Sequence, residues 1–173
     1  MRYLILIFCG CLLVLIVNGV SGAFSPAEVV HKYCELDARG ARVISGEYNK
    51  IRQLMAWEKE QVEPGWDCFK IIGNYNITSK DIDEKHATID VKYDVIAMCC
   101  SDDFLEEKEY SEVETFNLVF QKGEWKIKEY VVYPRVYKKS VIPILEQRLK
   151  YLQENGSEEN DKKAQKIAEF IKK

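Results

Sequence analysis

A cluster of basic residues of the kind that binds nucleic acid is missing from this sequence. Its 173 residues carry 25 lysines and arginines against 28 aspartates and glutamates, which gives a formal net charge of -3 at pH 7. The sequence shows no arginine-rich stripe. Proteins that bind DNA or RNA usually carry a clustered basic patch, so we expect no nucleic-acid partner.

Motifs of common metal and cofactor sites are also missing. The chain has only 2 histidines, His31 and His86, whereas zinc sites need three or four ligands. His31 and Cys34 are close enough on an expected helix to face one metal, but the other histidine, His86, is far along the chain. No Cys-x-x-Cys-His haem motif, phosphate-binding glycine loop or Gly-x-Ser-x-Gly elbow occurs. We therefore predict no metal and no cofactor.

A single long apolar run is present, at residues 4–17. Arg2 precedes this run, and the small, turn-prone residues 18–23 follow it. This order is typical of a secretory signal peptide, and the run is shorter than the roughly 20 residues that span a bilayer. We expect cleavage next to Ala23, a mature protein that begins near Phe24, and a periplasmic or secreted location.

Two helices are expected directly after this signal. Ser25, Pro26 and Glu28 have the arrangement of a capping box, and apolar residues at helical spacing continue to a stop at Gly40. A second apolar stripe at helical spacing predicts a helix over residues 46–57.

The apolar period changes to two from Trp66 onward. Four segments alternate in this way and are predicted to be strands: residues 69–75, 89–97, 116–120 and 125–131. A Lys122-Gly123 turn is expected between the last two. Each strand has one apolar face, as in an antiparallel sheet that is covered on one side.

The C-terminal part is predicted to be helical again. Ser140 is expected to cap a helix that ends at Asn155-Gly156, and Ser157 to cap a short amphipathic helix. The apolar stripe of this last helix is expected to dock on the protein itself, on a partner or on a membrane. Its mixed charges argue against strong membrane binding. Helices followed by consecutive strands predict an α+β fold. The expected division is a signal peptide (1–23), one domain (24–155) and a C-terminal helix or tail (156–173).

Three groups of residues, in their order, resemble a known superfamily. They are Pro26-Ala27-Glu28-Val29-Val30 with Tyr33 and Leu36-Asp37-Ala38, then Pro64-Gly65-Trp66-Asp67, then Phe116-Asn117-Leu118-Val119 with Gly123-Glu124-Trp125-Lys126-Ile127. Over residues 25–152 the chain resembles the nuclear-transport-factor-two-like superfamily, the cone fold shared with ketosteroid isomerase. The resemblance implies a curved antiparallel sheet wrapped around N-terminal helices, with a pocket between them. Some members are isomerases or dehydratases, and many bind ligands or only other proteins.

Asp37 is the candidate for chemistry. It shares a helix face with Tyr33 and Cys34, so the cone fold would direct it toward the pocket. A carboxylate in apolar surroundings has a raised pKa and can act as an acid or base near neutral pH. The alternative is that Asp37 accepts hydrogen bonds from Trp125, a tyrosine or Arg135 and serves only the core.

The expected pocket supplies the ligand-binding candidates: Tyr33, Asp37, Trp57, Tyr93 and Trp125. Such residues also form the core of a filled cone, and spacing does not separate the two cases. We interpret the protein as an exported, non-catalytic binding module for a small apolar ligand or a protein partner. The competing hypotheses are a small isomerase or dehydratase that uses Asp37, and a purely structural subunit of a homodimer.

Four cysteines follow the predicted signal: Cys34, Cys68, Cys99 and Cys100. Export permits disulfides without requiring them. If the first two strands form a hairpin whose tight turn centres on Asp83-Glu84, Cys68 stands opposite Cys99, and opposed residues share a face. We therefore predict a Cys68–Cys99 disulfide, with four free thiols as the alternative. A bulge, or a turn displaced by one residue, would favour Cys100 instead.

Overall fold

The computed structural model describes residues 24–43, 47–57, 65–101, 104–129 and 132–173. The predicted signal peptide lies outside the described residues, as does Val131 of the expected fourth strand. Within the described ranges, no helix is long and apolar enough to span a membrane.

The first described element is helix α1 (Pro26–Ala38). The predicted capping box is confirmed, because the Ser25 hydroxyl accepts the Glu28 N–H at 3.3 Å and the Glu28 carboxylate accepts the Ser25 N–H at 2.7 Å. The helix stops before Gly40, whose φ of 94° lies in the left-handed region that glycine adopts at low cost.

The second helix, α2 (Tyr48–Arg52), is much shorter than the predicted helix over residues 46–57. Beyond it the chain runs beside β4 (Glu124–Ile127), and Met55 forms a parallel bridge with Ile127. The Ile127 N–H donates to the Leu54 carbonyl at 2.9 Å, and the Ala56 N–H donates to the Ile127 carbonyl at 2.7 Å. Pairing with a distant strand therefore replaces the last helical turns.

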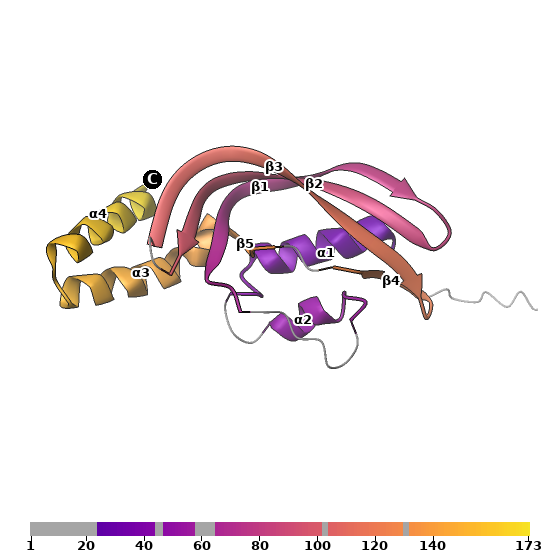
Figure 1. Cartoon of the computed structure of the whole chain (residues 1–173), viewed down its shortest axis with the longest axis horizontal. Helices are drawn as coiled ribbons and strands as arrows, with labels where there is room; N and C mark the ends of the chain where they lie inside the picture. Colours follow the sequence, from indigo (N-terminus) through magenta and orange to yellow (C-terminus); the bar gives the residue numbers. More distant parts are fainter. Residues whose placement is uncertain (1–23, 44–46, 58–64, 102–103, 130–131) are drawn as a thin grey trace, which may run out of the picture.

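A curled sheet of five strands forms the centre of the molecule (Figure 1). Its strands are β1 (Cys68–Ile82), β2 (His86–Cys100), β3 (Phe104–Gln121), β4 and β5 (Arg135–Tyr137), in the order β4-β3-β2-β1-β5. Neighbours pair antiparallel, except that β5 runs parallel to β1. The predicted α+β class with a curved sheet is confirmed. The predicted turn between β3 and β4 is also present, with positive φ at Lys122 (52°) and Gly123 (83°).

Two hydrophobic clusters fill the inner side of the sheet. The first joins α1 to β2 and β3, and includes Val30, Tyr33, Ile89, Val91 and Phe116. The second joins the other end of the sheet to helices α3 (Lys138–Glu154) and α4 (Glu158–Lys172). Figure 1 shows α3 and α4 at the left, beyond the end of α1 and beside the ends of the curled strands.

The C-terminal helices differ from the sequence prediction in one detail. Helix α3 begins at Lys138, directly after β5, so Ser140 lies inside the helix and does not cap it. Ser157 caps α4 as predicted, since its hydroxyl accepts the Asn160 N–H at 3.1 Å. Ile167 and Phe170 of α4 are buried in the second cluster, so the amphipathic stripe docks on the protein's own body.

The predicted Cys68–Cys99 disulfide is wrong. Cys68 is bonded to Cys100, with an S–S distance of 2.08 Å, and Cys99 is a buried free thiol. The connection between β1 and β2 is longer than a two-residue turn, so Ile82 pairs with Ala87. This pairing differs from the predicted register. Register shifts further along the two strands reverse part of the difference, and Cys68 pairs with Cys100. The strands therefore have the alternative register, in which a displaced turn and bulges favour Cys100 over Cys99.

Candidate functional site

A buried polar network surrounds Asp37 near the C-terminal end of α1. Asp37 is 2% exposed and shares the helix face of Tyr33 and Cys34, as predicted. Its Oδ2 accepts the backbone N–H of Arg135 at 3.0 Å and pairs with the Arg42 guanidinium at 3.2 Å. Burial raises the pKa of Asp37, although Arg42 and Arg135 oppose this shift. Among the described residues, no hydrogen-bond donor reaches Asp37 Oδ1.

The Arg135 side chain joins β5 to β3 across the inner side of the curled sheet. Its Nε donates to Glu112 at 2.9 Å and its Nη2 to Glu114 at 2.7 Å, while its Nη1 donates to the carbonyls of Val132 and Tyr133. Arg135 is 2% exposed. Arg135 is thus one of the partners expected if Asp37 serves the core, whereas the other observed partner, Arg42, was not predicted.

The space between α1 and the middle of the sheet is occupied by side chains. Tyr33 and Tyr93 are each 1% exposed, and the Tyr33 ring packs edge-on against Phe116 at 5.4 Å between centroids. The Tyr93 hydroxyl lies 3.0 Å from the Cys34 sulfur. Burial raises the pKa of the Cys34 thiol to about 12, so this thiol stays protonated near neutral pH.

His31 and Cys34 do not converge on one point. His31 is exposed and its Nδ1 lies 3.1 Å from the Tyr75 hydroxyl, whereas Cys34 is buried beside Tyr93. The described part of the chain contains no group of three or more His, Cys, Asp or Glu side chains that could hold a metal ion.

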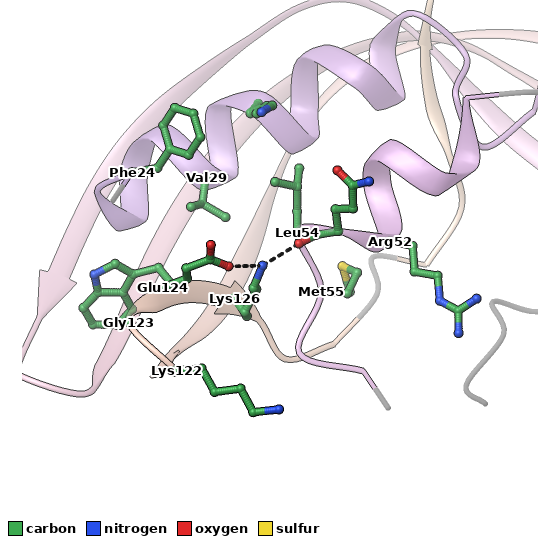
Figure 2. A pocket seen from close by; sticks show the side chains of 12 residues that line it. Phe24, Val29, Arg52, Leu54, Met55, Lys122, Gly123, Glu124 and Lys126 are labelled. Atoms are coloured by element: carbon green, nitrogen blue, oxygen red, sulfur yellow. Dashed lines mark hydrogen bonds and ion pairs between the residues drawn. The ribbon is translucent and has the colours of Figure 1, made fainter. Parts of the chain in front are cut away.

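A cavity of about 810 Å³ lies toward the other end of α1 (Figure 2). It is bordered by the start of α1, by residues 52–55 and by the β3–β4 turn with β4. Five apolar side chains line it: Phe24, Val29, Leu54, Met55 and Trp125. Val29 precedes Asp37 by eight residues, which corresponds to about 12 Å along the helix. The cavity and the Asp37 network are therefore separate places in the fold.

The cavity is also rich in positive charge. Its basic side chains are Lys32, Arg52, Lys122 and Lys126, and its acidic side chain is Glu124. The Lys126 ammonium lies 2.7 Å from both the Glu124 carboxylate and the Gln53 carbonyl, and Figure 2 draws both contacts. The Lys32 ammonium lies 4.7 Å from the Phe24 ring centroid.

The five predicted ligand-binding residues fall in three different places. Trp125 lines the cavity. Trp57 is half-buried against the first hydrophobic cluster. Tyr33, Asp37 and Tyr93 lie in the core. Sequence reasoning missed the lysines of the cavity, because they come from a helix, a turn and a strand whose proximity no spacing reveals.

Comparisons with known proteins give no further assignment: no protein-family model matches the sequence, and neither a curated protein nor a solved structure matches it significantly.

Proposed function

We propose that this protein is an exported, non-catalytic binding module of the nuclear-transport-factor-two-like cone type. Its site is the cavity between α1, residues 52–55 and β4, where it holds a small organic ligand. The observation that carries the proposal is the cavity itself. Its volume of about 810 Å³ is within the roughly 300–1,000 Å³ typical of small-molecule sites, and apolar side chains from three segments converge on it.

The cone architecture has two supports. The residue groups around Pro26, Trp66 and Trp125 resemble that superfamily in their order. In addition, the five-stranded sheet is curled, and α1 contacts β1, β2, β4 and β5. Export has support from the signal-like pattern of residues 1–23 and from the Cys68–Cys100 disulfide, since such bonds persist mainly outside the cytosol.

The enzyme hypothesis has less support than the binding hypothesis. Asp37 has a pKa raised by burial, as an acid or base often has. However, it is 2% exposed and does not line the cavity. A substrate in the cavity would have no direct contact with it, and catalysis requires a group within hydrogen-bond reach.

Native mass spectrometry of the protein purified from its own host tests the binding proposal. We expect a mass in excess of the mature chain that is released on unfolding. Trp125→Ala should lose this mass, because Trp125 lines the cavity. Trp66→Ala, the same change at a half-buried tryptophan outside the cavity, should keep it. Melting curves of both variants would exclude loss of ligand through unfolding.

An unliganded dimer in that experiment would contradict the proposal and favour the structural homodimer. N-terminal sequencing of the same sample tests export separately. We expect a first residue next to Ala23, whereas intact Met1 in a membrane fraction would contradict the export proposal.

A further inference from the structure

We infer that the ligand of this cavity is an anionic amphiphile, that is, an apolar body with one acidic group such as a carboxylate or sulfonate. The inference rests on the proposed function and names the chemical class of ligand. It depends on the contrast between the charge of the cavity and the charge of the chain.

The charge around the cavity is opposite in sign to that of the protein. The whole sequence has more acidic than basic residues, 28 against 25. Around the cavity, four basic side chains accompany a single carboxylate, that of Glu124. This carboxylate already pairs with Lys126 at 2.7 Å. The formal charges of the lining side chains therefore sum to a positive value, and a concave site strengthens the field of such charges.

Two of these charges border the cavity from different segments. Lys32 belongs to α1, next to Phe24, and Lys122 belongs to the β3–β4 turn. Figure 2 shows Lys122 at the β3–β4 turn, on the opposite side of the cavity from Phe24 and Val29. An acidic group bound in the cavity would lie in the combined electrostatic field of these two ammonium groups, which border it from different segments. A neutral ligand would reduce the hydration of these lysines without supplying a counter-charge, which is unfavourable.

The apolar part of the ligand has its own surface. Val29, Leu54 and Met55 are at most 7% exposed and lie behind the cavity, so the apolar surface open to a ligand comes mainly from Phe24 and the half-buried Trp125. Trp125 and Phe24 add two aromatic rings. Aromatic and aliphatic walls with a few charged groups are the usual composition of a small-molecule site. The cavity thus combines a small apolar surface with a larger polar surface that carries the cationic side chains.

Two fluorescent probes with the same aromatic body test the inference. The anionic probe is 8-anilinonaphthalene-1-sulfonate, and the neutral probe is N-phenyl-1-naphthylamine, which lacks only the sulfonate. Each is titrated into the mature protein after any native ligand has been removed. We expect the sulfonate to bind at least about tenfold more tightly, which corresponds to about 1.4 kcal/mol. This preference should decrease as salt is added.

Charge-removing variants locate the effect. Lys32→Gln combined with Lys122→Gln should reduce the preference to near unity and leave the affinity for the neutral probe unchanged. The matched control is Lys92→Gln combined with Lys166→Gln, which removes the same charge from two exposed positions outside the cavity. This control should keep the preference. Trp125→Ala should weaken the binding of both probes.

The outcomes separate the two proposals. Equal affinity for both probes, with loss of both in Trp125→Ala, would overturn the anionic class and leave the binding function intact. Failure of both probes to bind, or binding that Trp125→Ala does not change, would overturn the binding function itself. A preference for the sulfonate that survives in the Lys32/Lys122 variant would place the anion elsewhere and overturn the inference.

Discussion

Loss of the Cys68–Cys100 disulfide should destabilise the protein more than replacement of either free cysteine, Cys34 or Cys99. The bond joins the first residue of β1 to the last residue of β2, over a sequence separation of 32. It therefore closes the whole β1–β2 hairpin in the unfolded chain. Cys99 stands next to Cys100 and is free, so it provides a control that differs in position by one residue.

The magnitude follows from the length of the closed loop. In the chain-entropy account, a cross-link over 32 residues removes about 12 cal/mol/K from the unfolded state, or about 4 kcal/mol at 25 °C. For a protein of this size, each kcal/mol shifts the melting temperature by roughly 2–4 °C. Reduction of the bond should thus lower the melting temperature by roughly 8–16 °C.

The assay is urea denaturation of the wild type, Cys68→Ala, Cys99→Ala and Cys100→Ala, each with and without a reductant. The wild type and Cys99→Ala should lose stability when reduced, while Cys68→Ala should not respond. A plain tryptic map cannot replace this comparison, because Cys99 and Cys100 lie in one peptide between Lys92 and Lys108. If Cys99→Ala abolished the response and Cys100→Ala kept it, the observed strand register would be refuted.

Three further predictions concern buried groups. Because burial raises the pKa of Asp37, the folded wild type binds more protons than the unfolded chain. Its stability relative to Asp37→Asn should therefore rise as the pH falls from 7 toward the unfolded pKa of about 3.9, as measured by urea midpoints; a relative fall would contradict this sign. Burial also raises the pKa of Cys34 and of Cys99 to about 12, so neither thiol should react with Ellman's reagent at pH 8 until guanidinium is added. Rapid reaction of the native protein would show that these thiols are accessible. Ile167→Ala should cost about 2–5 kcal/mol in unfolding free energy, because Ile167 is 0% exposed between α4 and the rest of the second cluster. Lys166→Ala, on the exposed side of the same helix, should stay within about 0.5 kcal/mol of the wild type.

Local signals predicted the parts of the fold that local interactions determine. The capping box at Ser25 and the turn at Lys122-Gly123 are both present, because their hydrogen bonds or backbone angles involve residues within one turn. The alternation of Ile89, Val91 and Tyr93 predicted β2 for a similar reason, since these side chains face the same core.

Long-range interactions determine the parts that the sequence did not reveal. The first half of β3 was missed because most side chains of residues 106–115 are exposed or half-buried and polar, so no apolar alternation marks it. β5 has three residues and pairs with β1, more than sixty positions earlier in the chain. The Cys68 partner depended on the loop at Asp83 and on register shifts, and the sequence pattern contains neither.

For the site, too, local spacing predicted some features and long-range contacts determined the others. Helical spacing with Tyr33 and Cys34 predicted that Asp37 would be buried, and it is. Its partner could not be chosen from spacing, because Arg135 is 98 residues away and arrives through β5. The cavity was not predictable at all from one segment, since α1, residues 52–55 and β4 each contribute only part of its wall.

The contrast between the two ends of α1 explains why the cavity, our proposed ligand site, lies at its N-terminal end. Near the C-terminal end, Arg135 binds Glu112 and Glu114 of β3 while its backbone holds Asp37. Burying these charges has a large desolvation cost, so such a network is weak evidence for added stability. Its geometric effect is clearer, because it fixes β5 and β3 around the end of α1 and leaves Asp37 2% exposed. Near the N-terminal end, the short strand β4 pairs with only the last residues of β3, and no comparable ionic network fills the space beside Val29 among the described residues. The cavity with its basic side chains therefore lies at the end of α1 that this ionic network does not close.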